Sequence, residues 1–178
     1  GYIFITLNNV KEGGGFKPEY AWIKSDRLKD HHFLKEKDLI ITNTEQTKDG
    51  RLLAFPGIVY FPQDYGEKVG VFSHHITRLV PKEANSKYFL YYFLLTTQNE
   101  SVTFHTGSVI WGLDVNNFAN HKHAVWAPTD IMRTFEKTAE ALFEKIILNQ
   151  KEISGLSRIR DSLLPKLMSG KIRVAVGK

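Results

Sequence analysis

The sequence is short of several residue types and patterns, and each shortage excludes a class of protein. Its 178 residues include no cysteine, which excludes a disulfide framework and thiolate metal sites and is typical of a cytoplasmic protein. The longest apolar run, residues 88–95, is far shorter than the roughly 20 residues that a membrane-spanning helix needs. Charged residues (24%) and apolar residues (42%) occur in the proportions of a folded globular chain. We therefore expect one globular domain with an appendage.

The motifs of common enzyme classes are also missing. The glycines at residues 13–15 do not open a helix, so they do not form a cofactor-binding loop, and the sequence contains neither a phosphate-binding loop nor a Gly-x-Ser-x-Gly elbow. One enzyme hypothesis stays open, a metal-dependent nuclease assembled from Asp38, Glu45 and Asp49 with Lys48. Otherwise we expect a protein without catalytic activity and without a cofactor.

The histidines do not make a convincing metal site. They occur mostly as neighbours, and neighbours in a strand point to opposite faces. Only His121 and His123 would share a face, and no third ligand stands at a suitable spacing. We therefore expect no bound metal.

Residues 1–128 have the pattern of an α/β (α+β) domain. Short β-branched or aromatic runs bounded by turn formers predict strands at residues 2–7, 38–42, 57–61, 75–80 and 125–127. An apolar stripe predicts a helix from about Ser86 to Thr97, and Asp114 is placed to cap a short helix that ends near Asn120.

Residues 129–178 predict one long helix with a short tail. Thr129 or Asp130 can cap its start, and Pro165 should end it near residue 164 because proline cannot join the hydrogen-bond ladder. Apolar residues alternate in steps of three and four, the pattern of a coiled-coil seam. The predicted seam, which needs a partner helix, consists of Phe135, Ala139, Leu142, Ile146, Asn149, Ile153, Leu156 and Leu163. A helix that simply packs on its own domain is the alternative interpretation.

The C-terminal run at residues 157–173, SRIRDSLLPKLMSGKIR, resembles the ending of specificity subunits of type I restriction-modification systems. In that family, a target-recognition domain precedes a Gly-Ser element, a short apolar segment with proline, and a spacer helix. The corresponding residues here are Gly107 with Ser108, residues 125–128, and the long helix. The resemblance covers nearly the whole chain.

The resemblance implies a non-enzymatic reader of double-stranded DNA. Such a subunit guides a methylation subunit and, through it, a restriction subunit. Two recognition domains read the halves of a split target, and paired spacer helices set the distance between them. The first few dozen residues of a typical recognition domain have no counterpart before Gly1, so we expect the chain to start inside that domain. Because it has one domain and one helix, we expect either a half-subunit that forms a homodimer or one half of a longer chain.

The polar segments at residues 42–51 and 105–111 are candidate DNA contacts, and the glycine loop at residues 11–17 is either a third contact or a plain solvent loop. The first supplies amides that suit adenine and an arginine that suits guanine, and the second supplies hydroxyls and a glycine for close approach to phosphate. A polar surface hairpin would have a similar composition. The candidate residues are Lys17, Asn43, Thr44, Gln46, Lys48, Arg51, His105, Thr106, Gly107 and Ser108.

The net charge of +5 adds little to this interpretation. Most of the excess lies in residues 129–178, so a DNA-binding face on the domain must be a local patch. A stand-alone dimeric DNA-binding protein remains the alternative function.

Overall fold

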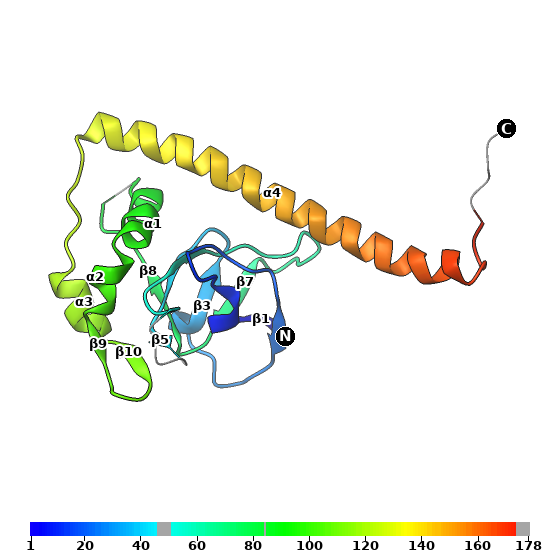
Figure 1. Cartoon of the computed structure of the whole chain (residues 1–178), viewed down its shortest axis with the longest axis horizontal. Helices are drawn as coiled ribbons and strands as arrows, with labels where there is room; N and C mark the ends of the chain where they lie inside the picture. Colours follow the sequence, from blue (N-terminus) through cyan, green and yellow to red (C-terminus); the bar gives the residue numbers. More distant parts are fainter. Residues whose placement is uncertain (46–50, 84, 174–178) are drawn as a thin grey trace. The chain divides into compact units, whose positions relative to one another are not determined.

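The computed structural model describes residues 1–45, 51–83 and 85–173, and it divides the chain into two compact units, Gly1–Ala141 and Leu142–Lys178. Unit 1 contains the strands, three short helices and the first part of helix α4 (Thr129–Met168), and unit 2 contains the rest of α4 (Figure 1). An α+β domain followed by a long helix is therefore confirmed. Within the described residues, the structure contains no helix long and apolar enough to cross a membrane.

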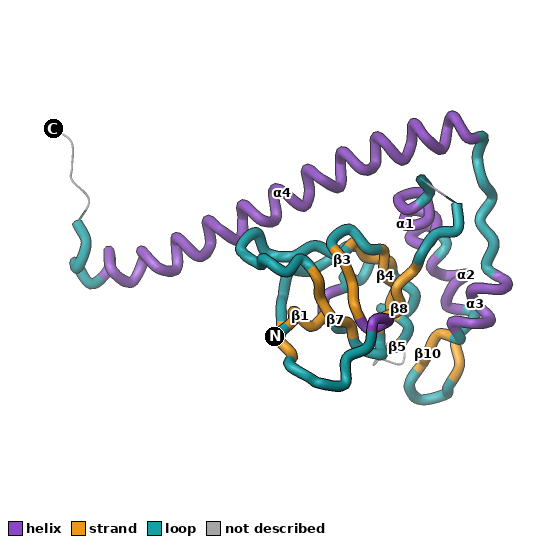
Figure 2. The backbone as a smooth tube through the Cα atoms, turned by 180° about the vertical axis from the view of Figure 1, so that it is seen from behind, coloured by secondary structure: helices purple, strands orange, loops and turns teal. Residues whose placement is uncertain are grey.

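The strands of unit 1 form three small sheets (Figure 2). The mixed sheet has the order β2-β1-β7-β3, in which β1 and β7 are parallel; the other two sheets, β6-β4-β8 and β5-β10-β9, are antiparallel. The strands are β1 (Tyr2–Ile5), β2 (Ala21–Ile23), β3 (Phe33–Lys35), β4 (Leu39–Thr42), β5 (Thr44–Glu45), β6 (Pro56–Ile58), β7 (Val69–Phe72), β8 (Ile76–Leu79), β9 (His105–Thr106) and β10 (Trp111–Leu113).

The predicted strand at residues 2–7 is confirmed only as far as Ile5, because the chain turns there. A 3-10 helix, Leu7–Asn9, follows the strand. The buried Asn9 side chain accepts a hydrogen bond from the Thr6 amide (2.8 Å) and donates to the Lys17 and Glu19 carbonyls (3.1 and 2.7 Å). This side chain replaces the ladder bonds that a longer strand would have made.

Two other predicted strands are wrong in whole or in part. Strand β6 stops at Ile58, although residues 59–61 are buried. Residues 125–127 belong to an extended connection, 122–128, outside the sheets. The Trp126 ring lies 5.2 Å from the Phe89 ring, while Val125 is 88% exposed.

The core of unit 1 surrounds β4, in which all four residues are buried. Ile41 of this strand packs with Leu53, Leu94, Leu113 and Phe118 in one cluster. These residues come from a turn, a helix, strand β10 and another helix. The cluster therefore attaches the small sheet β5-β10-β9 to the centre of the domain.

The short helices are α1 (Lys87–Thr96), α2 (Gln98–Val102) and α3 (Val115–His121). The predicted helix at Ser86 to Thr97 is confirmed, and so is Asp114 as the cap of α3, because its carboxylate accepts from the Asn117 amide (3.0 Å).

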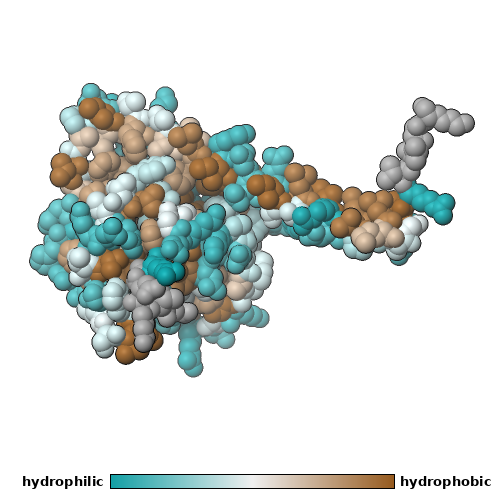
Figure 3. Space-filling model, in the orientation of Figure 1, coloured by the Kyte–Doolittle hydropathy of each residue, from teal (hydrophilic) through white to brown (hydrophobic). Residues whose placement is uncertain are grey.

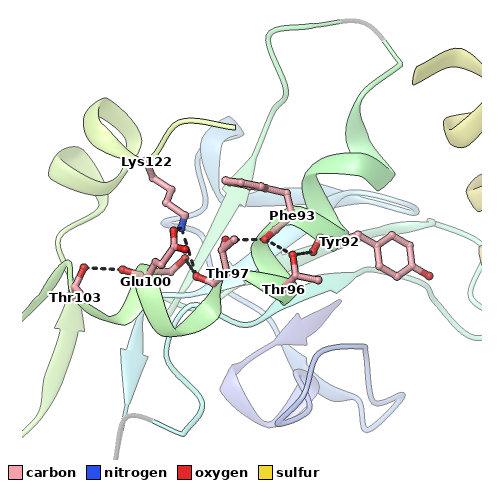
Figure 4. A network of polar contacts seen from close by, with 8 residues as sticks. Tyr92, Phe93, Thr96, Thr97, Glu100, Thr103 and Lys122 are labelled. Carbon is pink, nitrogen blue, oxygen red and sulfur yellow. Dashed lines mark hydrogen bonds and ion pairs between the residues drawn. The ribbon is translucent and has the colours of Figure 1, made fainter. Parts of the chain in front are cut away.

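Lys122, just after α3, joins that helix to the junction of α1 and α2 (Figure 4). Its ammonium group donates to the Glu100 carboxylate (2.7 Å) and the Thr97 carbonyl (3.4 Å) and lies 5.2 Å from the centre of the Phe93 ring. With 7% of its side chain exposed, Lys122 is nearly buried, so this charge depends on these partners.

Helix α4 is longer than predicted. The Met132 amide donates to the Pro128 carbonyl (2.9 Å), so Pro128 occupies the cap position and Asp130 lies in the first turn. Pro165 lies inside the helix, which continues to Met168. The prediction that the helix ends at residue 164 is therefore wrong. Proline has no N–H to donate and its ring crowds the preceding turn, but the Ser169 amide still donates to the Pro165 carbonyl (3.1 Å), so the last turn forms after it.

The first part of α4 is anchored in unit 1 by a buried carboxylate. Glu136 is 7% exposed, and its Oε1 accepts a hydrogen bond from the Phe89 amide at 2.6 Å. That amide is in the first turn of α1, where N–H groups lack partners in the helix. The cap residue Ser86 makes no side-chain cap bond, so Glu136 caps α1 from another helix.

We predict that Glu136→Ala lowers the free energy of unfolding by about 2 kcal/mol, because it leaves the half-buried Phe89 amide without its acceptor. Glu140→Ala is the matched control one helical turn later. Glu140 makes an ion pair with Lys37 at 3.6 Å and is 52% exposed, so its loss should cost less than about 1 kcal/mol. Urea denaturation of both variants measures the difference, and equal losses would contradict the anchoring role.

Candidate nucleic-acid interface

The structure brings parts of the two candidate DNA-contact segments into one sheet. Strand β10 pairs with β5 on one side, where Gly112 lies opposite Thr44, and with β9 on the other, where Gly112 lies opposite Thr106. The loop between β9 and β10 is at the lower edge of the views in Figures 1 and 2. Residues about 60 positions apart in the sequence therefore form a continuous surface.

The β9–β10 hairpin requires a glycine at its turn. Gly107 has a φ of +87°, and a Cβ atom there would collide with the carbonyl oxygen of Ile110. The turn is therefore fixed in a shape that no other L-residue adopts without strain.

Two of the predicted contact residues brace this hairpin. The His105 ring stacks on the Trp111 ring, with 4.1 Å between centroids, and its Nδ1 lies 2.9 Å from the Val102 carbonyl oxygen. The Thr106 hydroxyl donates to the Gly112 carbonyl (3.2 Å). Ser108 lies in the exposed loop. The loop backbone and Ser108 are thus better placed for a ligand than His105 or Thr106.

The Asn43 side chain, a predicted adenine contact, makes hydrogen bonds within the protein. Its amide nitrogen donates to the His74 carbonyl and to the Thr77 hydroxyl, both at 3.0 Å, and its amide oxygen accepts from the Thr44 hydroxyl at 3.0 Å. Pairing with adenine needs the oxygen and the nitrogen of one amide together. In this structure, both groups are used within the protein.

Thr42, Asn43 and Glu45 form a polar clamp around the candidate surface. The Thr42 hydroxyl accepts from the Phe55 amide (3.0 Å) and donates to the Leu52 carbonyl, and the Glu45 carboxylate accepts from the Leu52 amide. Thr42 and Glu45 are buried. The polar clamp therefore fixes the turn at residues 51–54.

Arg51 is the exposed residue at the start of this turn. Because the clamp holds the adjacent Leu52 against β5, Arg51 lies beside the small sheet. Thr44 is half-buried in β5 itself. The predicted contacts Gln46 and Lys48 lie outside the described residues.

Lys17 belongs to a different part of unit 1. Its amide donates to the Asn9 carbonyl (2.7 Å), and the preceding loop is tied to β6 by a bond from the Gly15 amide to the Pro56 carbonyl (3.1 Å). The small sheet does not include Lys17.

The described residues do not assemble the nuclease cluster or a metal site. Asp38 accepts from the Lys35 amide (2.8 Å) and pairs with Arg78 (3.7 Å), while the Glu45 carboxylate belongs to the polar clamp. Asp49 and Lys48 lie outside the described part of the chain. In that part, no group of three or more metal-binding side chains comes together.

His74 is exposed and His75 is half-buried. The rings of His74 and His75 lie 3.8 Å apart. Burial, followed by the neighbouring His74, lowers the pKa of His75, which favours its neutral form. The backbone carbonyl of His75 accepts a hydrogen bond from the backbone N–H of Asn43 (3.0 Å), so residue 75 helps to hold the polar clamp in position.

Sequence reasoning missed the exposed apolar tip of the hairpin. Val109 and Ile110 are 68% and 60% exposed. The only available signal was two β-branched residues between a turn glycine and a tryptophan. Exposed apolar groups beside hydroxyls suit contact with thymine methyl groups in the major groove.

Comparison with known proteins identifies two relatives. The type I restriction enzyme MjaIX specificity subunit of Methanocaldococcus jannaschii is 37% identical over 102 residues, which cover 57% of this chain and 23% of the relative. The type I restriction enzyme HindI specificity subunit of Haemophilus influenzae is 30% identical over 105 residues, which cover 56% of this chain and 22% of the relative.

The chain is similar to type I restriction specificity subunits. The predicted resemblance is thereby confirmed. The match to each relative spans about a quarter of that relative's length. No protein-family model matches the chain.

We predict that Gly107→Ala loosens the β9–β10 hairpin and lowers the free energy of unfolding by about 2 kcal/mol, because the positive φ and the Ile110 carbonyl both oppose a side chain. Hydrogen exchange should accelerate at the Leu113 amide, which donates to the Asn43 carbonyl (2.8 Å). Gly66→Ala is the control, because a Cβ there meets nothing within 4 Å. Unchanged protection at Leu113 would contradict this role of the turn.

Proposed function

We propose that this chain is a recognition module of a type I restriction-modification specificity subunit that reads one half of a split target in double-stranded DNA. The proposal rests on the agreement of two independent observations. The sequence is similar to two specificity subunits, and two segments chosen separately as DNA contacts adjoin in one small sheet.

The proposed reading surface consists of the hairpin loop with Ser108, the neighbouring Thr44, and Arg51. Arg51 pairs bidentately with a guanine in the major groove, and the hairpin backbone and hydroxyl contact phosphate. Val109 and Ile110 at the tip add contacts to thymine methyl groups. Gln46 and Lys48 remain proposed contacts on sequence grounds alone.

The proposed role is recognition without catalysis. The module docks a methylation subunit and, through it, a restriction subunit, and these partners supply the chemistry. Residues 1–128 act as the recognition domain, and residues 129–178 act as a spacer that sets the distance between half-sites. A homodimer of such modules would read an interrupted palindrome, because twofold symmetry of the protein requires it in the target.

The decisive experiment co-expresses the parent protein of this chain with its methylation subunit and maps adenine methylation across the host genome. Methylation at one split motif supports the proposal. A soluble complex that leaves every adenine unmodified, combined with a tight sequence-specific gel shift by the chain alone, would instead establish a stand-alone DNA-binding protein.

We predict that Arg51→Ala relaxes the methylated motif at one base position, with discrimination there falling about tenfold to 100-fold, because a bidentate arginine–guanine pair is lost. Arg27→Ala is the matched control, since Arg27 is also exposed but lies after β2 and outside the proposed surface. Sequencing of the methylated sites in both strains measures the motif. An unchanged motif in the Arg51 variant would remove this residue from the proposed contacts.

A further inference from the structure

Helix α3 follows the proposed reading surface without an intervening loop. Strand β10 ends at Leu113, and the next residue, Asp114, is the cap of α3. The Leu113 amide donates to the Asn43 carbonyl (2.8 Å), and the Asp114 amide donates to the Phe104 carbonyl (3.0 Å). The start of the helix is therefore fixed to the segments that precede β5 and β9, and α3 lies beside β9 and β10 in Figures 1 and 2.

The small sheet and α3 turn their inner faces to the same core cluster. Leu113 and Phe118 are buried members of this cluster, and Trp111 and Val115 pack against it. Gly112 alternates with Trp111 and Leu113 along the strand, so it lies on the opposite face of the sheet. The outer faces of the sheet and of the helix therefore adjoin, and both point away from the cluster.

The outer face of α3 consists of asparagine side chains. Because Val115 and Phe118 point to the core, the helical period turns residues 116, 117 and 120 away from it. Asn116, Asn117 and Asn120 are all exposed. In Figure 3, apolar side chains at the lower edge of the view belong to the β9–β10 loop, and the surface over α3 above them is mainly hydrophilic.

The side-chain amides on this face are free to bind a ligand. Those of Asn9 and Asn43 are held by several hydrogen bonds within the protein. Those of Asn116, Asn117 and Asn120 make no hydrogen bond to any residue that the structure describes. Each therefore keeps both donors and its acceptor for a partner outside the chain.

Helix stability does not explain these asparagines. Asparagine is one of the weaker helix formers, yet it occupies three of the seven positions of α3. The helix depends instead on the Asp114 cap (3.0 Å) and on the burial of Phe118, which is 5% exposed. The composition of the outer face is therefore better explained by contact with a ligand.

The charge along α3 suits a polyanion. The sequence from Val115 to His121 contains no acidic residue, and the exposed His121 and His123 follow the asparagines. The Glu100 carboxylate near the end of the helix is paired with Lys122 at 2.7 Å. A phosphate backbone would therefore meet no unpaired negative charge on this face.

The spacing of the amides matches the bases of B-DNA. One asparagine amide can accept from N6 of adenine and donate to N7 in the major groove, which is about 12 Å wide and admits an α-helix. Asn116 and Asn120 are four residues apart, or about 6 Å along the helix axis. Bases in one strand follow each other at about 3.4 Å, so the two amides can reach adenines one or two steps apart.

The distance to the hairpin loop also fits one half-site. Strand β10 has three residues, so the loop and the start of α3 are about 10 Å apart. That distance corresponds to about three base pairs. The loop and the helix can therefore contact neighbouring parts of the same half-site.

We propose that the outer face of α3 enters the major groove of the half-site, where Asn116 and Asn120 each pair with an adenine. This inference rests on the proposed function, to which it adds a second reading element beside the hairpin loop and Arg51. It predicts a half-site with two adenines, one or two base pairs apart, that α3 reads.

The first test selects binding sites from random double-stranded DNA with the parent protein in complex with its methylation subunit. Asn116→Ala and Asn120→Ala should each lower the discrimination at a different adenine about tenfold to 100-fold, because a bidentate pair is lost. Asn8→Ala is the matched control, since Asn8 is an exposed asparagine in the 3-10 helix Leu7–Asn9, outside the small sheet and α3. Alanine is the better helix former, so the α3 variants should unfold at a temperature no lower than that of the wild type.

The second test removes one acceptor from the DNA. Replacing the adenine assigned to Asn120 by 7-deazaadenine deletes N7 and keeps the base pair. Wild-type binding should weaken about threefold to tenfold, as expected for one lost hydrogen bond. Binding by the Asn120→Ala variant should not change, because that variant no longer donates to N7.

The other outcomes separate this inference from the proposed function. A wild-type complex that selects no motif overturns both. A wild-type complex that selects a split motif overturns the inference alone if both α3 variants select the same motif with unchanged discrimination. An equal loss of affinity for every sequence also overturns it, because it assigns α3 to phosphate contact without base reading.

Discussion

The candidate interface depends on the polar clamp formed by Thr42, Asn43 and Glu45. Thr42 ends the buried strand β4, Asn43 follows it and Glu45 lies in β5. Their side chains bond to residues 52, 55, 74 and 77. Such bonds matter most when they are buried, since an unsatisfied polar group inside a protein is costly. The polar clamp therefore holds the surface segments next to the core in fixed positions, with the turn at residues 51–54 on one side and β10 on the other.

Structural features that depend on residues close together in the chain could be predicted from the sequence. The cap at Asp114 and the span of α1 follow from interactions across three or four residues, which sequence patterns display. The pairing of β5 with β10 joins residues far apart in the chain, and their sequences have no signal that specifies it. For the same reason residues 125–127 have strand composition but form no strand.

The roles of individual polar residues were harder to predict than their positions. The sequence predicts Asn43 and Arg51 equally well as DNA contacts, because both are polar residues in the same candidate segment. The structure shows for Asn43 what the sequence does not, because the carbonyl of His74 and the hydroxyl of Thr77 accept hydrogen bonds from its side-chain amide. Helix α4 shows a comparable effect, because Ala139 continues the apolar period of Leu142 but is buried in unit 1. Periodicity identifies apolar positions without showing which partner covers each one.

In the proposed role of α4 as a spacer, its heptad period would restrict how the distance between two recognition domains can change. Insertion or removal of one or two residues would rotate one part of the predicted seam away from the other and break it. Only a change of seven residues preserves both apolar faces, and it alters the helix length by about 10 Å. That length corresponds to about three base pairs of DNA. A spacer of this kind would therefore change the separation of its half-sites in discrete steps, so a family of such proteins would sample a small set of target spacings.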